Sequence, residues 1–122
     1  MEILIVDSSI QIIERLAEIL SEAKNIKTIY RAVSYAQASA LFSTAKPDVV
    51  LLDIGLLGNK SVDLLKEIKA ANSKTAVIVL SIHVDELTKQ KFTSAGADLF
   101  FDKYHEFEKI TGAINLIAAK KN

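Results

Sequence analysis

Short continuous apolar runs alternate along this chain with longer segments of helical spacing, and this alternation restricts the fold more than any other feature. The runs predict strands at residues 3–6, 26–30, 49–52, 76–80 and 99–101. The first segment between runs carries a helical stripe of apolar residues, namely Ile10, Ile13, Leu16, Ala17 and Leu20. The last segment carries a second stripe, made of Phe107, Ile110, Ile114 and Ile117. The order is therefore strand then helix, repeated five times.

The predicted strands read as unbroken apolar runs, without alternating polar residues. This pattern is typical of strands buried on both faces, which indicates a parallel sheet with helices on each side. Half of the 122 residues are hydrophobic, which is enough for one core, and no linker or repeat divides the chain. We therefore expect residues 1–122 to form a single doubly wound α/β domain. Its five strands would follow the flavodoxin-like order 2-1-3-4-5, with five helices.

Composition narrows the classes of function. The 15 basic and 15 acidic residues cancel, which argues against binding to nucleic acid or to a membrane surface. The absence of cysteine excludes disulfides and thiolate metal sites. His83 and His105 lie too far from other ligand types to indicate a metal site. No apolar run has the features of a signal peptide or the length of a membrane span, so we expect a cytoplasmic protein.

Capping patterns predict where two of the helices begin. Ser34 and Gln37 have the spacing of a capping box at the second helix. At the first helix Ser8 has the same spacing to a glutamine, although Asp7 or Ser9 could cap the helix instead. We prefer Ser8 as the cap.

Reactive side chains follow four of the five predicted strands. Asp7, Asp53 and Ser81 end three of them, and Lys103 follows the fifth. Ligands of open parallel sheets bind at the carboxyl ends of the strands, and the order 2-1-3-4-5 makes the first and third strands neighbours. Asp7 and Asp53 would then face each other, and their repulsion favours a cation such as Mg²⁺. A lysine and a hydroxyl beside them suit the transfer of a phosphoryl group to a carboxylate.

Four segments carry a family resemblance. "ILIVDSS", "PDVVLLDIGLLG", "AVIVLSIH" and "GADLFFDK" occur in an order and at intervals that resemble the receiver domain of two-component response regulators. The resemblance covers essentially the whole chain. It implies that Asp53 accepts a phosphoryl group, and that Asp7, Asp53 and the backbone carbonyl of Gly55 hold Mg²⁺. It also implies that Ser81 and Lys103 contact the phosphoryl group.

The same resemblance implies a signalling domain, which catalyses at most its own phosphorylation and dephosphorylation. A histidine kinase or a phosphotransfer protein would donate the phosphoryl group. Phe100, three residues before the lysine, matches the switch aromatic on the face formed by the fourth helix, fifth strand and fifth helix. That face would bind a downstream protein partner and could form a homodimer. The fourth helix, within residues 84–95, has a thin apolar stripe (Val84, Leu87 and Ala95) that predicts weak anchoring.

Several residues depart from the family pattern around this site. The family usually has a second acidic residue directly after the first, and that residue is normally the direct Mg²⁺ ligand. Here it is Ser8, so metal affinity should fall by about 10–100-fold. Leu57 and Gly58 replace the usual Pro-Gly, and Tyr104 replaces a proline after the lysine. Ile82 replaces a small residue and could narrow access to the phosphoacceptor.

Plainer interpretations of single residues stay open. Lys103 could be a solvated lysine paired with Asp102 or Glu106. Ser81 could be only the polar end of its strand, and Phe100 only a core residue of an edge strand.

Two other functions compete for the whole chain. Ser8 favours a pseudo-receiver, an interaction module in which phosphorylation is weakened or absent. A flavin or nucleotide protein on the same fold is disfavoured, because neither GxGxxG nor GxxxxGK[ST] occurs.

Overall fold

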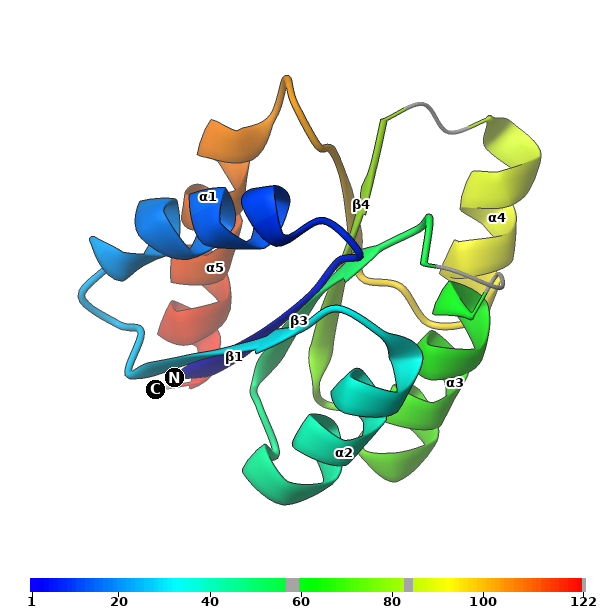
Figure 1. The fold of residues 1–122 in the computed structure, drawn as a ribbon, viewed down its shortest axis with the longest axis horizontal. Coiled ribbons are helices and arrows are strands. Elements are labelled where there is room, and N and C mark those ends of the chain that lie inside the picture. The colour runs from blue at the N-terminus through cyan, green and yellow to red at the C-terminus, as the bar shows by residue number, and fades with distance from the viewer. Residues whose placement is uncertain (57–59, 83–84, 122) are drawn as a thin grey trace.

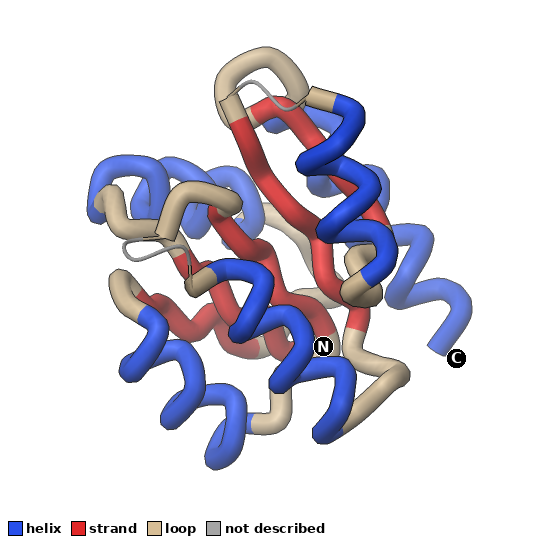
Figure 2. The backbone as a smooth tube through the Cα atoms, turned by 90° about the vertical axis from the view of Figure 1, so that its right-hand side faces the viewer, coloured by secondary structure: helices blue, strands red, loops and turns tan. Residues whose placement is uncertain are grey.

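One parallel sheet with helices against both faces makes up the computed structural model, which describes residues 1–56, 60–82 and 85–121 (Figures 1 and 2). The strands lie in the predicted order, β2-β1-β3-β4-β5. The elements are β1 (Glu2–Val6), α1 (Ile10–Ser21), β2 (Thr28–Ala32), α2 (Tyr35–Ala45), β3 (Val49–Asp53), α3 (Ser61–Ala71), β4 (Ala76–Ser81), α4 (Glu86–Ser94), β5 (Leu99–Asp102) and α5 (Phe107–Lys121). Helices α1 and α5 cover one face of the sheet, and α2, α3 and α4 cover the other (Figure 1). Within the described residues, no helix combines the length and the apolar character needed to cross a membrane.

The central strands are buried on both faces, as the unbroken apolar runs predict. Ile3 and Ile5 of β1 pack in the layer with α1 and α5, whereas Leu4 and Val6 pack in the layer with α2, α3 and α4. Successive side chains of a strand point to opposite faces, so a strand between two helical layers needs an apolar residue at every position. β1 therefore contributes to both layers of the core.

The edge strands depart from that prediction. β2 is only partly buried, with Arg31 exposed, and β5 begins at the exposed Leu99. Both strands lie at the rim of the sheet, where the helical layers cover them incompletely. β2 also begins two residues later than predicted, because its pairing with β1 starts where Glu2 lies opposite Thr28.

The apolar stripes of α1 and α5 form as predicted, with one exception. The residues buried or packed against the core are Ile13, Leu16, Ala17, Leu20, Phe107, Ile110, Ile114 and Ile117. Ile10 is instead 65% exposed, and Ile12 is buried. Ile10 is the first residue of its helix, so no preceding turn covers its side chain.

The fourth helix is anchored by a residue that the predicted stripe omits. Leu87 is 79% exposed, whereas Phe92 is buried. The helix begins at Glu86, where the Asp85 carboxylate accepts a hydrogen bond from the Thr88 N–H at 2.7 Å. This start leaves Leu87 in the first, solvent-facing turn. Of the other two residues of the predicted stripe, Ala95 packs against the core and Val84 lies outside the described residues.

The cap of α1 is Ser9, and the preference for Ser8 is wrong. Ser9 Oγ accepts a hydrogen bond from the Ile12 N–H at 3.3 Å, whereas Ser8 is exposed. The Asp7 carboxylate accepts a hydrogen bond from the Ser9 N–H at 2.8 Å, which is an Asx turn and delays the helix by one residue. The predicted cap of α2 is confirmed, since Ser34 Oγ accepts from the backbone of the glutamine three residues later.

Alanine substitutions at Ser9 and at Ser8 should show which of these two serines caps α1. Ser9→Ala should lower the free energy of unfolding by about 1 kcal/mol, because the Ile12 N–H loses its acceptor. Ser8→Ala should change that free energy by less than about 0.5 kcal/mol. Urea unfolding followed by circular dichroism measures both values, and an equal or larger loss at Ser8 would contradict the assignment.

Candidate functional site

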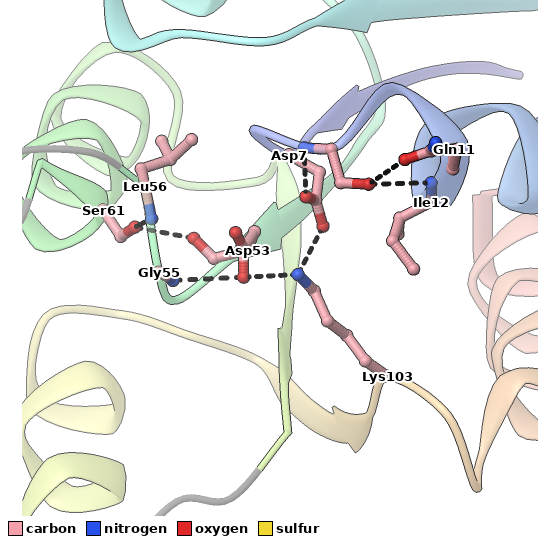
Figure 3. A network of polar contacts seen from close by, with 9 residues as sticks. Asp7, Gln11, Ile12, Asp53, Gly55, Leu56, Ser61 and Lys103 are labelled. Atoms are coloured by element: carbon pink, nitrogen blue, oxygen red, sulfur yellow. Dashed lines mark hydrogen bonds and ion pairs between the residues drawn. The ribbon is translucent and has the colours of Figure 1, made fainter.

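Asp7 and Asp53 lie side by side at the carboxyl end of the sheet, and the Lys103 side chain bridges them (Figure 3). β1 and β3 are neighbours with Val6 opposite Leu52, so the residues that follow them meet at one edge. Lys103 Nζ lies 2.7 Å from Asp7 Oδ2 and 2.9 Å from Asp53 Oδ1. Only 1% of Asp7, 4% of Asp53 and 7% of Lys103 is exposed. The structure thus brings three of the predicted site residues together in one buried ion triad.

Burial and the triad shift the pKa values of Asp7 and Lys103. Burial raises the pKa of the Asp7 carboxyl above its usual value, and the hydrogen bonds from Lys103 and the Ser9 backbone offset only part of that rise. Burial alone would lower the pKa of Lys103, but its contacts with Asp7 and Asp53 outweigh burial and raise that pKa. Lys103 therefore stays charged at neutral pH and supplies the positive charge that two adjacent carboxylates need.

The plainer interpretation of Lys103 as a solvated surface lysine is wrong. Both of its expected surface partners have other contacts: Asp102 Oδ1 lies 3.0 Å from His105 Nδ1, and Glu106 Oε2 lies 2.9 Å from Lys109 Nζ. The Lys103 side chain instead turns inward to the carboxylates.

Ser81 lies on β4, next to β3 in the sheet, and Phe100 lies on β5, the strand that Lys103 follows. Ser81 ends β4 and is buried, and its carbonyl accepts a hydrogen bond from the Lys103 N–H at 2.7 Å. Phe100 is half-buried and packs edge-on against Phe92 of α4, with ring centroids 6.2 Å apart and planes at 89°. Ser81 and Phe100 are among the residues that line a hollow of about 290 Å³. Both residues therefore border open space.

Gly55 and Ser61 hold the chain that leaves Asp53. The Gly55 N–H donates to Asp53 Oδ1 at 3.1 Å. Ser61 Oγ, which is buried, donates to the Asp53 carbonyl at 2.6 Å and accepts from the Leu56 N–H at 3.3 Å (Figure 3). Ser61 is not among the predicted site residues, because a single serine at the start of a helix has no distinctive pattern.

Three of the residues that depart from the family pattern, Ser8, Ile82 and Tyr104, are exposed. The other two, Leu57 and Gly58, lie outside the described residues. Ser8 has no carboxylate, so the triad contains two carboxylates, those of Asp7 and Asp53.

The oxygen atoms at this edge fit a Mg²⁺ ion held by few protein ligands. Among the described residues no three His, Cys, Asp or Glu side chains gather in a metal cluster. Mg²⁺ nevertheless binds through one or two carboxylates and keeps several waters. Within the described part of the chain, the buried Asp7 Oδ2 contacts only the Lys103 ammonium, so it retains lone pairs for a cation. Asp7, Asp53 and the Gly55 carbonyl are the groups that would hold such an ion.

Comparison with known proteins gives one consistent family. The family model described as "Response regulator receiver domain" matches residues 3–115. Sporulation initiation phosphotransferase F from Bacillus subtilis is 27% identical over 93% of this chain and 90% of that protein. A protein-glutamate methylesterase/protein-glutamine glutaminase from Idiomarina loihiensis is 31% identical over 86% of this chain. The chain spans 28% of that relative and 47% of a Fimbriae Z protein from Salmonella typhimurium.

Solved structures share the fold at low sequence identity. A two-component response regulator from Clostridium difficile superposes with a TM-score of 0.90 at 21% identity, covering 99% of this chain and 98% of that one. The receiver domain of a DNA-binding response regulator from Colwellia psychrerythraea gives 0.88 at 24% identity, covering 97% of this chain and 98% of that one. At these identities the likeness shows the fold alone.

Removal of the Lys103 charge should destabilise the domain in a way that acid or Mg²⁺ relieves. Lys103→Met should lower the free energy of unfolding at neutral pH by about 3–5 kcal/mol, because two buried carboxylates lose their counter-charge. The loss should shrink as the pH falls below neutral, since protonation of Asp7, whose pKa burial raises, removes one charge from the folded state. Urea unfolding at neutral pH and at a mildly acidic pH measures this change. The same measurement with Mg²⁺ present should show a smaller loss, because a bound cation would supply the missing positive charge.

The matched control for that experiment is Lys66→Met, which removes an exposed lysine of α3. It should change the free energy of unfolding by less than about 0.5 kcal/mol. A Lys103→Met loss no larger than the control would contradict the stabilising role of the triad.

Proposed function

The chain belongs to the response regulator receiver domain family, and from that premise we propose that Asp53 accepts a phosphoryl group with Mg²⁺ bound beside it. The donor in this proposal is a histidine kinase or a phosphotransfer protein. The observation that carries it is the buried triad of Asp7, Lys103 and Asp53. The triad lies where ligands of doubly wound sheets bind, at the carboxyl ends of the strands around the switch point. Receiver domains are signalling domains, so the phosphoryl group serves as a signal.

The contacts of Asp53 indicate which of its oxygens reacts. Lys103 Nζ and the Gly55 N–H both engage Oδ1, at 2.9 and 3.1 Å, so we assign the attack on phosphorus to Oδ2. A new O–P bond forms while the N–P bond of a donor phosphohistidine breaks, and the imidazole leaves with the electron pair. Mg²⁺, when bound, would neutralise charge on the phosphoryl oxygens.

Phosphorylation of Asp53 would change the charge around Lys103. Once phosphorylated, Asp53 no longer carries a carboxylate charge, and its negative charge lies on the phosphoryl oxygens. Lys103 would follow that charge while keeping its contact with Asp7, and the Ser81 hydroxyl can donate a hydrogen bond to the same group. We assign Ser81 this role because it ends the strand next to β3 and is buried.

The output of the domain is proposed to be protein binding on the α4-β5-α5 face, either to a downstream partner or to a second copy of the chain. Exposed apolar side chains occur on each of its three elements, namely Leu87, Leu99 and Leu116. Phe100 lies on the middle element and contacts α4 through Phe92, so a change at Phe100 would reach this face.

The second candidate is a pseudo-receiver, favoured by the exposed Ser8 at the position of the usual metal ligand. Lys103 already supplies a positive charge to both carboxylates, which offsets part of their repulsion without a metal. In this alternative the domain binds partners in one state, and Asp53 takes up a phosphoryl group weakly or not at all.

Reaction with a small phosphodonor separates the two candidates. Incubation with acetyl phosphate and Mg²⁺ should add one phosphoryl group, seen by intact mass, and chelation of Mg²⁺ should abolish it. Asp53→Asn should abolish it as well, whereas the exposed Asp63→Asn of α3 should leave it unchanged. No addition at high Mg²⁺ would leave the pseudo-receiver as the better account.

Restoring the missing acid tests the place of residue 8 in the pocket. Ser8→Asp should tighten Mg²⁺ binding by about 10–100-fold, as measured by calorimetry. Ser73→Asp adds the same charge at an exposed position distant in sequence and should have no such effect. Equal affinities for the two variants would show that residue 8 does not reach the metal.

A further inference from the structure

We propose that Ser61 fixes the direction of the Gly55 carbonyl, and that it is therefore a positioning residue for the Mg²⁺ ion. This inference rests on the proposed function, because it takes that carbonyl as a metal ligand. Ser61 is the first residue of α3, only 1% of it is exposed, and its hydroxyl points back toward the chain that leaves β3 (Figure 3).

The hydroxyl of Ser61 makes two hydrogen bonds with one short stretch of backbone. It donates to the Asp53 carbonyl at 2.6 Å and accepts from the Leu56 N–H at 3.3 Å. A hydroxyl has one proton to donate and lone pairs to accept with, so both bonds can exist together. Ser61 thus joins the two ends of the segment that contains Gly55.

The hydrogen bond from the Leu56 N–H to Ser61 Oγ sets the direction of the Gly55 carbonyl, because the peptide unit between Gly55 and Leu56 is planar. The Gly55 carbonyl and the Leu56 N–H belong to the same peptide plane, and in a trans peptide they point in opposite directions. Among the described residues every peptide is trans. With the Leu56 N–H held toward Ser61 Oγ, the Gly55 carbonyl must point away from Ser61. Within the described part of the chain, no group donates a hydrogen bond to that carbonyl oxygen.

The two preceding peptide planes are held as well. The Ile54 N–H donates to the Leu80 carbonyl at 3.0 Å, which fixes the plane that also contains the Asp53 carbonyl. The Gly55 N–H donates to Asp53 Oδ1 at 3.1 Å, which fixes the next plane. The plane of the Gly55 carbonyl is the third, and Ser61 is the group that holds it.

Glycine makes this restraint necessary. Gly55 has no Cβ, so its backbone angles are less restricted than those of any other residue. A Cβ at this position would lie 3.6 Å from both carboxylate oxygens of Asp53, an ordinary contact, so a larger residue is not excluded by space. A flexible residue with a ligand carbonyl loses affinity for its metal unless another group orients that carbonyl.

A purely structural role for Ser61 makes a different prediction. Loss of a buried hydroxyl that makes hydrogen bonds lowers stability whatever its role. A structural role would therefore change the free energy of unfolding and leave the Mg²⁺ dissociation constant alone. A positioning role changes the dissociation constant in the folded protein.

The experiment is a titration of the ¹⁵N-labelled chain with Mg²⁺ alone, without phosphodonor, read from the amide shifts of Gly55 and Leu56. Ser61→Ala should raise the Mg²⁺ dissociation constant about tenfold. Ser61→Thr, which keeps the hydroxyl, should restore affinity to within about twofold. Thr75→Val removes another buried hydroxyl, from the start of β4 and away from the triad, and should leave the constant unchanged. The same titration is made in the Ser8→Asp background, which keeps a weak site measurable.

The outcomes are decisive in each direction. An unchanged dissociation constant in Ser61→Ala, with faster hydrogen exchange at the Leu56 amide, would overturn the proposal. So would the absence of Mg²⁺ shifts at Gly55 and Leu56 in both backgrounds. If Ser61→Ala does not fold, Ser61→Cys replaces the hydroxyl with a weaker hydrogen-bonding thiol and should raise the constant in the same way. Failure of phosphoryl transfer alongside normal Mg²⁺ binding would count against the proposed function and not against this inference.

Discussion

Two carboxylates buried side by side require a positive charge, and the rest of this structure is arranged so that Lys103 can supply it. The lysine begins beyond β5, whereas Asp53 ends β3, with β4 between them. Neighbouring strands are about 4.8 Å apart, so β3 and β5 are separated by roughly 10 Å across the sheet edge. The bond from the Lys103 N–H to the Ser81 carbonyl brings its backbone against the end of β4. From there the extended side chain reaches both acids, and sheet order and side-chain length are therefore matched.

This arrangement bears on two chemical states of the pocket in the proposed function: one without ligand, and one with a cation or a phosphoryl group bound. Without a metal, the lysine alone faces the two carboxylates, so the buried charge set is incomplete: two negative groups and one positive one. In the proposed function, a divalent cation or a phosphoryl group would alter that sum, and Lys103 would be the charge that responds. The triad would then be both the element that stabilises the domain without ligand and the element that a ligand has to rearrange.

Sequence alone was sufficient for the sheet order and for the meeting of Asp7, Asp53 and Lys103, because both follow from the sequence of strands and from where each strand stops. The sequence was insufficient where a shift of one residue along the chain decides which side chain makes a contact. Ser8 and Ser9 have equivalent capping chemistry, and the choice between them depends on the Asp7 side chain turning back onto the Ser9 N–H. Ser61 could not be identified because its partners, Asp53 and Leu56, lie eight and five residues away, across a loop whose path no periodic pattern describes.

The single aromatic anchor of α4 has a consequence for how a signal leaves the domain. Phe92 is the buried residue of this helix, and it rests edge-on against Phe100 of β5. With one buried anchor, we expect the helix to separate from the sheet as one small cooperative unit, at a lower free-energy cost than unfolding the two core layers. An event at the strand ends that altered the packing of one ring would change how often that separation occurs. The time that α4 stays packed on the sheet would then depend on whether the site is phosphorylated.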